Sequence, residues 1–147
     1  MKEQLVTFET AKLAKEKGFE LETQYTYDVD ANYDLHLALR GTYGNYERNI
    51  YSAPTQSLLQ KFIREERGVH IEIHRNASGY YWSMCKSDGG TDLGWCDHRG
   101  PNLGGAWDTF EDALENAMYV QLSYDLPNDM KVIKHWGNYV EFALKNE

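Results

Sequence analysis

Two thiols and two polar side chains gather in the second half of the chain: Cys85, Cys96, Asp97 and His98. A cysteine with a histidine base within hydrogen-bond reach is the arrangement of a cysteine nucleophile. Cysteine sulfur and imidazole nitrogen are also zinc ligands, which makes Cys85, Cys96 and His98 candidate metal ligands. The chain has no C-x-x-C pair, and structural zinc takes four ligands in tighter spacings. A small buried residue and a loop thiol are the simpler interpretation.

The same region offers a second route to catalysis. Metal-assisted hydrolysis could be supported there by Asp88, Asp92, Asp97 and His98. The glycine pairs nearby fit neither phosphate-binding pattern, G-x-x-x-x-G-K-[ST] or G-x-G-x-x-G. A small metal-dependent or cysteine hydrolase that uses residues 87–108 is therefore the enzyme alternative, and no cofactor is expected.

His70, Glu72 and His74 alternate along a predicted strand and share one of its faces. Residues four apart on a strand are separated by about 13 Å. Because a zinc–nitrogen bond is about 2 Å long, the two histidines cannot share one ion, and only adjacent members of the set could do so. An exposed polar sheet face is the simpler interpretation.

Aromatic residues give the stronger indication. Tyrosine and tryptophan dominate the energetics of protein interfaces, and four of them cluster around one predicted hairpin and the loop after it, which makes them candidate binding residues: Tyr80, Trp82, Trp95 and Trp107. In a strand over residues 80–86, Tyr80 and Trp82 share one face and Tyr81 lies on the other. We expect one face to be core and the other, if exposed, to be an interface. Stacking on single-stranded nucleic acid is the rival role, but it needs a basic groove.

The chain carries a formal net charge of −8. An acidic protein lacks the basic face that binds phosphate, so double-stranded nucleic acid is not an expected partner. No apolar run approaches the length of a membrane span, and no signal peptide is recognisable at the start. We therefore expect no membrane association, a cytoplasmic location, and two cysteines that stay reduced there.

Helical periodicity with threonine caps, glycine stops and a first-turn proline predicts helices over residues 7–18, 54–67, 109–122 and 129–145. Alternation predicts strands over residues 21–27, 33–39, 69–75 and 80–86, and a short one near residues 93–96. The order α-β-β-α-β-β-α-α predicts an α+β fold: residues 1–147 as a single domain, with an antiparallel sheet of four to five strands and helices packed on one face. Residues 87–108 form a long glycine-rich stretch of the kind that is functional or mobile.

The segment YSAPTQSLLQKFIRE, which starts at Tyr51, reads as a capped amphipathic helix that leads to a glycine stop and a strand. It resembles an uncharacterised family of small proteins from phages and prophage elements of the Bacteroides group. The resemblance covers residues 52–73 well and residues 109–118 more loosely, and the family is expected to have tryptophan where this chain has Phe62. It implies a small accessory gene of a phage or mobile element, and it transfers no site residue.

The leading hypothesis is a non-enzymatic accessory protein that binds a host or phage protein through an aromatic surface with an acidic rim. The alternatives are the small hydrolase and a component of virion structure or assembly. The hydrolase predicts bound metal or a selectively reactive thiol, and the assembly component predicts self-association.

Overall fold

The computed structural model describes residues 3–30, 32–39, 49–86, 95–97, 100–102, 105–125, 130–136 and 139–144. The chain divides into two compact units, Met1–Phe62 and Ile63–Glu147. Helices and antiparallel sheets occur together, so the predicted α+β class is confirmed. The expectation that the units form one domain stays a prediction. No helix in the described ranges combines the length and the apolar character needed to cross a membrane.

The first unit opens with helix α1, Phe8–Glu16. Thr7 caps it as predicted, because its side-chain oxygen accepts a hydrogen bond from the backbone N–H of Thr10. Ala11 and Ala14 are buried on the inner face of the helix.

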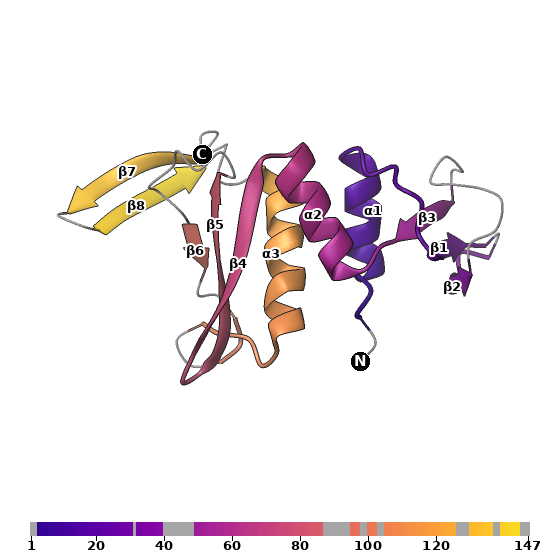
Figure 1. Ribbon diagram of the computed structural model, residues 1–147, viewed down its shortest axis with the longest axis horizontal. Helices are drawn as coiled ribbons and strands as arrows, with labels where there is room; N and C mark the ends of the chain where they lie inside the picture. The colour runs from indigo at the N-terminus through magenta and orange to yellow at the C-terminus, as the bar shows by residue number, and fades with distance from the viewer. Residues whose placement is uncertain are drawn as a thin grey trace. The chain divides into compact units, whose positions relative to one another are not determined.

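The first unit also contains a three-stranded antiparallel sheet in the order β2-β1-β3 (Figure 1). Its strands are β1 (Tyr25–Val29), β2 (Leu35–Leu39) and β3 (Ile50–Ala53). The sequence does not predict β3, because a four-residue strand that runs into a helix cap shows no clear alternation. Tyr25 lies in the middle of the sheet, opposite Leu39 on one side and Ala53 on the other.

Helix α1 contacts β3, and the Phe8 ring forms the aromatic part of this packing. The ring meets Tyr27 and Tyr51 edge-on, with centroid distances of 5.8 and 5.4 Å. The Tyr27 hydroxyl donates to the Val6 carbonyl at 2.5 Å. This tyrosine therefore serves the core of the first unit rather than a surface.

The segment before α1 joins the sheet through its backbone. Leu5 and Thr55 form an antiparallel bridge. The Val6 N–H donates to the Pro54 carbonyl at 3.0 Å, and the Gln56 N–H donates to the Gln4 carbonyl at 2.9 Å. Backbone pairing thus ties the start of the chain to the region where β3 ends.

Helix α2, Gln56–Glu66, spans the boundary between the two units. The Thr55 hydroxyl accepts from the Leu58 N–H at 3.2 Å and caps the helix. Pro54 therefore precedes the helix, which corrects its predicted place in the first turn. The apolar face predicted from the sequence is buried, and the Phe62 ring meets Phe19 edge-on at 5.1 Å.

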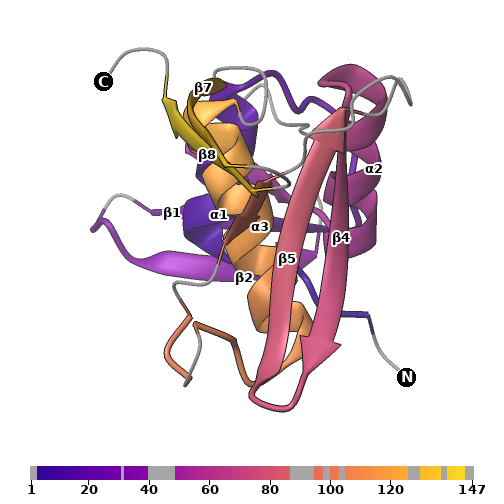
Figure 2. The same ribbon diagram turned by 90° about the vertical axis from the view of Figure 1, so that its left-hand side faces the viewer.

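The second unit is built on the long hairpin of β4 (Val69–Asn76) and β5 (Gly79–Lys86), which Figure 2 shows in front of a helix. A short strand, β6 (Trp95–Asp97), completes the sheet in the order β4-β5-β6. All three strands were predicted close to these positions. Helix α3, Phe110–Tyr124, packs against β4 and β5, and Thr109 caps it as predicted.

The core of the second unit lies between α3 and this hairpin. Apolar side chains from one face of the sheet and one face of the helix are buried there: Val69, Ile71, Trp82, Met84, Ala113, Leu114, Ala117, Met118 and Leu122. The spacing of the helical members confirms the apolar stripe that the sequence predicts for α3.

The fourth predicted helix, over residues 129–145, is wrong. The chain forms a hairpin there, with β7 (Met130–Trp136) paired to β8 (Tyr139–Leu144). Valine, isoleucine and aromatic residues dominate this segment, and they fit a pleated strand better than a helix. The predicted single sheet of four to five strands is also wrong, since the described strands form two three-stranded sheets and the two-stranded sheet β7-β8.

Candidate functional site

Three leucines of β2 expose large parts of their side chains on one face of the first sheet. Leu35, Leu37 and Leu39, here called the leucine row, are 47, 52 and 69% exposed. They lie opposite Val29, Tyr27 and Tyr25 of β1 in unbroken antiparallel register. The sequence places these leucines on one face but gives no sign that the face is open.

The described residues do not give the outer edge of β2 the usual protection of a sheet edge. Within the described part of the chain, β2 has one strand neighbour, β1. Natural edge strands are blunted by lysine, proline or a bulge that twists them away. The strand LHLAL has none of these residues and pairs without a register shift. Such an edge is a ready template for another strand.

The turn before β2 presents a tyrosine in a costly conformation. The Asp30 N–H donates to the Asp34 carbonyl and the Tyr33 N–H donates to the Asp30 carbonyl, each at 3.0 Å. Tyr33 has φ +63° and is 90% exposed. A side chain in the left-handed region costs about 1–2 kcal/mol, and glycine or asparagine is more usual there. Tyrosine at the hairpin tip is thus held against local preference, as residues at binding sites often are.

Asp30 organises this turn through its carboxylate. One oxygen accepts the N–H groups of Asn32 and Asp34, each at 2.9 Å, and the other lies 2.9 Å from His36 Nε2. The hydrogen bond from His36 is the largest cause that lowers the pKa of Asp30 below its ordinary value of 3.8, and the backbone N–H groups add to it.

Acidification is expected to loosen the β1–β2 turn. Because the folded pKa of Asp30 lies below 3.8, its carboxylate stabilises the hairpin at higher pH, and this contribution is lost as pH falls through the folded pKa. Amide hydrogen exchange at Asn32 and Asp34 should accelerate in that acid range, after correction for intrinsic rates. The Asp30→Asn variant should show no such acceleration. Equal acid sensitivity in both proteins would contradict this assignment.

A pocket of about 610 Å³ opens in the first unit beside the leucine row. Its apolar wall includes Leu5, Tyr25, Leu37 and Leu58. Because Leu37 belongs to both the row and the pocket wall, the two features form one continuous surface on the same face of the sheet.

Two charged side chains of the described residues line this pocket, and both are acidic, Glu3 and Glu22. Glu3 accepts a hydrogen bond from the Ser57 hydroxyl. Among the described residues that line the pocket there is no lysine or arginine, and the charge of these residues favours a basic or neutral occupant over an acidic one.

The predicted aromatic residues do not form one exposed patch on the described residues. Trp82 is fully buried, and its Nε1–H donates to Asn116 Oδ1 at 2.9 Å. The face shared by Tyr80, Trp82 and Met84 is therefore the core face of β5, which settles the choice between its two faces. Trp82 acts as a core residue and offers no surface to a partner.

Tyr80 and Trp107 meet through their backbones. Each N–H donates to the other's carbonyl, at 2.8 and 2.7 Å, which bridges the segment before α3 to the start of β5. The half-buried Tyr80 ring also meets Phe110 edge-on and lies 4.9 Å from the Arg75 guanidinium carbon. These contacts hold the segment before α3 against β5, and they leave less of the Tyr80 ring exposed for contact with a partner.

Some of the remaining candidate residues lie on the neighbouring strands β5 and β6. Trp95 and Cys96 lie in β6 opposite Met84 and Ser83, and Cys85 lies in β5 opposite His70. Several predicted positions lie outside the described residues or side chains: Asp88, Asp92, Trp95, Cys96, Asp97 and His98.

The polar face of β4 and β5 brings Glu72 between two histidines. Its carboxylate oxygens lie 3.6 Å from His70 Nε2 and 3.8 Å from His74 Nε2. His74 Nε2 also lies 2.7 Å from Ser83 Oγ. A serine–histidine–carboxylate relay needs the serine and the carboxylate on opposite ring nitrogens, whereas both approach the same nitrogen here. Among the described side chains, no group of three could hold a metal ion.

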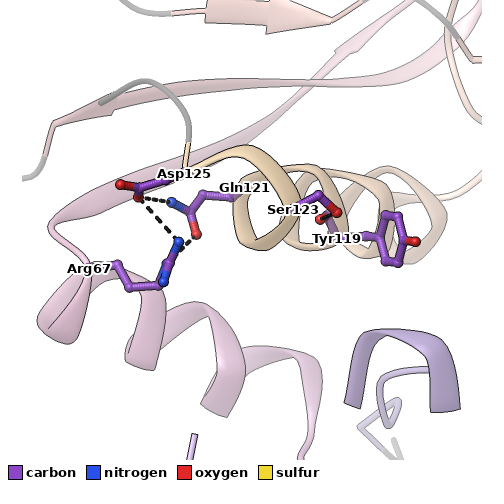
Figure 3. A network of polar contacts seen from close by, with 5 residues as sticks. All are labelled: Arg67, Tyr119, Gln121, Ser123 and Asp125. Atoms are coloured by element: carbon purple, nitrogen blue, oxygen red, sulfur yellow. Dashed lines mark hydrogen bonds and ion pairs between the residues drawn. The ribbon is translucent and has the colours of Figure 1, made fainter. Parts of the chain in front are cut away.

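A partly buried polar network, which the sequence does not reveal, closes one end of α3 (Figure 3). Arg67 Nε donates to Gln121 Oε1 at 2.8 Å, and Arg67 also pairs with Asp125 Oδ1 at 3.2 Å. Gln121 is fully buried and donates to the same Asp125 oxygen at 3.1 Å. Asp125 ends the helix with φ +50°. The network links the residue after α2 to the end of α3, which is a structural role.

Comparison with protein-family models, curated proteins and solved structures finds no match to this chain.

Proposed function

We propose that this protein is a non-enzymatic accessory protein of a phage or mobile element, and that it binds a host or phage protein through the leucine row. The exposure of Leu35, Leu37 and Leu39 on one sheet face carries the proposal. Single exposed apolar residues are ordinary, but a contiguous row that continues into a pocket is typical of an interaction surface. The row replaces the predicted aromatic patch as the contact surface.

The size of the row is sufficient to matter for affinity. Full burial of one leucine side chain contributes about 1.5–3 kcal/mol. Each leucine of the row exposes roughly half or more of its surface, so its burial by a partner would contribute about 1 kcal/mol or more. Three such contributions, about 3 kcal/mol together, correspond to about a hundredfold in affinity.

The hydrolase alternative draws less support from the described residues. Ser83 and His74 are within hydrogen-bond distance, but the carboxylate is on the wrong side of the imidazole for a relay. The two histidines and Glu72 lie on a largely exposed strand face, where water competes with every charge interaction.

The proposal is tested by capture of a partner from bacterial host lysate, infected and uninfected, with Leu37→Asp beside the wild type. An aspartate in the middle of the row places a charge where apolar contact is required, so we expect at least a tenfold loss of the captured protein. Tyr119→Asp is the matched control, because Tyr119 is a comparably exposed apolar residue in the second unit. It should capture as much as the wild type.

Thermal unfolding must show that both variants fold. Equal capture by Leu37→Asp and the wild type, or no captured protein in either lysate, would count against the proposal.

A further inference from the structure

We infer that the occupant of the leucine row is an extended strand of the partner, which pairs with the outer edge of β2 and places a lysine or arginine side chain in the pocket beside Leu37. This inference rests on the proposed function and specifies the partner's chemistry. It combines three observations on the first unit: a strand edge that no described strand pairs with, an exposed apolar row and a pocket with two acidic side chains.

The open edge determines the form of the occupant. A β-strand presents backbone N–H and C=O groups along both edges, and β1 uses one edge of β2. In the described part of the chain no strand uses the other edge. An added strand would lie about 4.8 Å away and satisfy those groups, as in strand-addition complexes. A helix laid across the row would leave them unpaired.

The row determines the pattern of the occupant's side chains. Alternate residues of an added strand point to the same face as the residues opposite them. The leucines therefore require apolar side chains at every second position of the partner strand. The other face presents His36 and Ala38, where small polar residues fit.

The pocket determines the charge of the occupant. Glu3 and Glu22 line it together with apolar residues such as Leu5 and Leu58, and no basic side chain in the described ranges lines it. In the described part of the chain no ion pair involves Glu22. A lysine or arginine can pack its methylene stem on the apolar wall and hold its charge near the two carboxylates. The net charge of −8 attracts a basic segment before contact as well.

The test uses labelled synthetic heptapeptides and the full-length protein. The first peptide reads Val-Thr-Val-Thr-Lys-Thr-Val, with one lysine among the apolar positions. The second has glutamate in place of the lysine. The third has the sequence of the first, but alternate backbone nitrogens are methylated, so that this edge of the peptide cannot donate hydrogen bonds to β2. Binding is followed by anisotropy and by amide shifts of β2, at peptide concentrations up to about 1 mM.

We expect saturable binding of the lysine peptide, with shifts confined to β2 and the pocket, and at least tenfold weaker binding of the other two peptides. The Glu3→Gln/Glu22→Gln variant should lose most of the preference for lysine over glutamate. Glu16→Gln, an exposed change of the same kind on α1, should keep that preference.

Three results would overturn the inference. The methylated peptide could bind as well as its parent, the double glutamine variant could retain the full preference for lysine, or no peptide could bind. If no peptide binds while Leu37→Asp still abolishes partner capture, the inference fails and the proposed function stands. Sedimentation that shows a dimer dispersed by Leu37→Asp would identify a second copy of this chain as the occupant instead.

Discussion

Replacing Trp82 with alanine is expected to lower the free energy of unfolding by about 3–5 kcal/mol. Trp82 is the largest fully buried side chain among those whose burial the structure describes, and it packs between the β4–β5 hairpin and α3. The truncation removes its apolar contacts and leaves a cavity that close-packed neighbours cannot fill. It also removes the hydrogen bond to Asn116. Urea unfolding followed by far-ultraviolet circular dichroism measures the loss.

Trp82→Phe separates packing from hydrogen bonding. It keeps an aromatic ring but removes the Nε1–H donor, so it should cost less than alanine. Asn116 is half-buried, so water can replace part of the lost bond. A cost below about 1 kcal/mol for Trp82→Ala would mean that Trp82 is not the core residue described here.

Gly79→Ala should be the second most damaging change, with a cost of at least about 2 kcal/mol. Gly79 has φ +137°, a conformation that disfavours any side chain. An added Cβ would also lie 2.2 Å from the Trp107 carbonyl oxygen, so the backbone would have to move apart there. We expect the Tyr80–Trp107 bridge to open, with faster amide exchange at both residues.

Gly18→Ala is the matched control for this change. Gly18 also has a positive φ, +99°, but an added Cβ would meet nothing within 4 Å. It therefore reports backbone strain without the clash, and it should cost about 1 kcal/mol. If both alanine variants cost the same, the close approach at Gly79 does not contribute.

Local signals predicted most of the helices and the long hairpin. Thr7 and Thr109 cap helices where the sequence places them, because a cap depends only on residues within one turn. The β4–β5 hairpin follows from alternation and a glycine-containing turn, which are also local features. Even the short β6 lies close to its predicted position.

Residues 130–144 were mispredicted because two periodicities fit the same residues. Apolar residues there satisfy a helical spacing, but many are β-branched or aromatic, and Gly137-Asn138 separates the two strands with a two-residue hairpin signal. The sequence does not predict the division of the strands into separate sheets, for another reason. Strand neighbours are determined by long-range pairing, which no window of sequence contains.

The sequence predicts one part of the candidate surface, the shared face of the leucines, but not its exposure. Alternation places Leu35, Leu37 and Leu39 on one face, but a leucine row on a strand normally means core. Whether such a row is buried depends on which distant segments pack against it. Trp82 is the reverse case, because the sequence places it among candidate interface residues and the structure buries it in the core. The pocket beside Leu37 combines distant segments, which the sequence does not bring together.

The backbone pairing of the amino-terminal segment bears on the order in which the chain assembles. The β4–β5 hairpin closes across the two residues Ala77 and Ser78, and such hairpins form in about 1–10 μs. The backbone hydrogen bond between Val6 and Pro54 instead joins positions 48 apart, so a much longer loop must lose its conformational entropy first. The first residues described are thus expected to be among the last to find their place, after the second unit has a nucleus of local contacts.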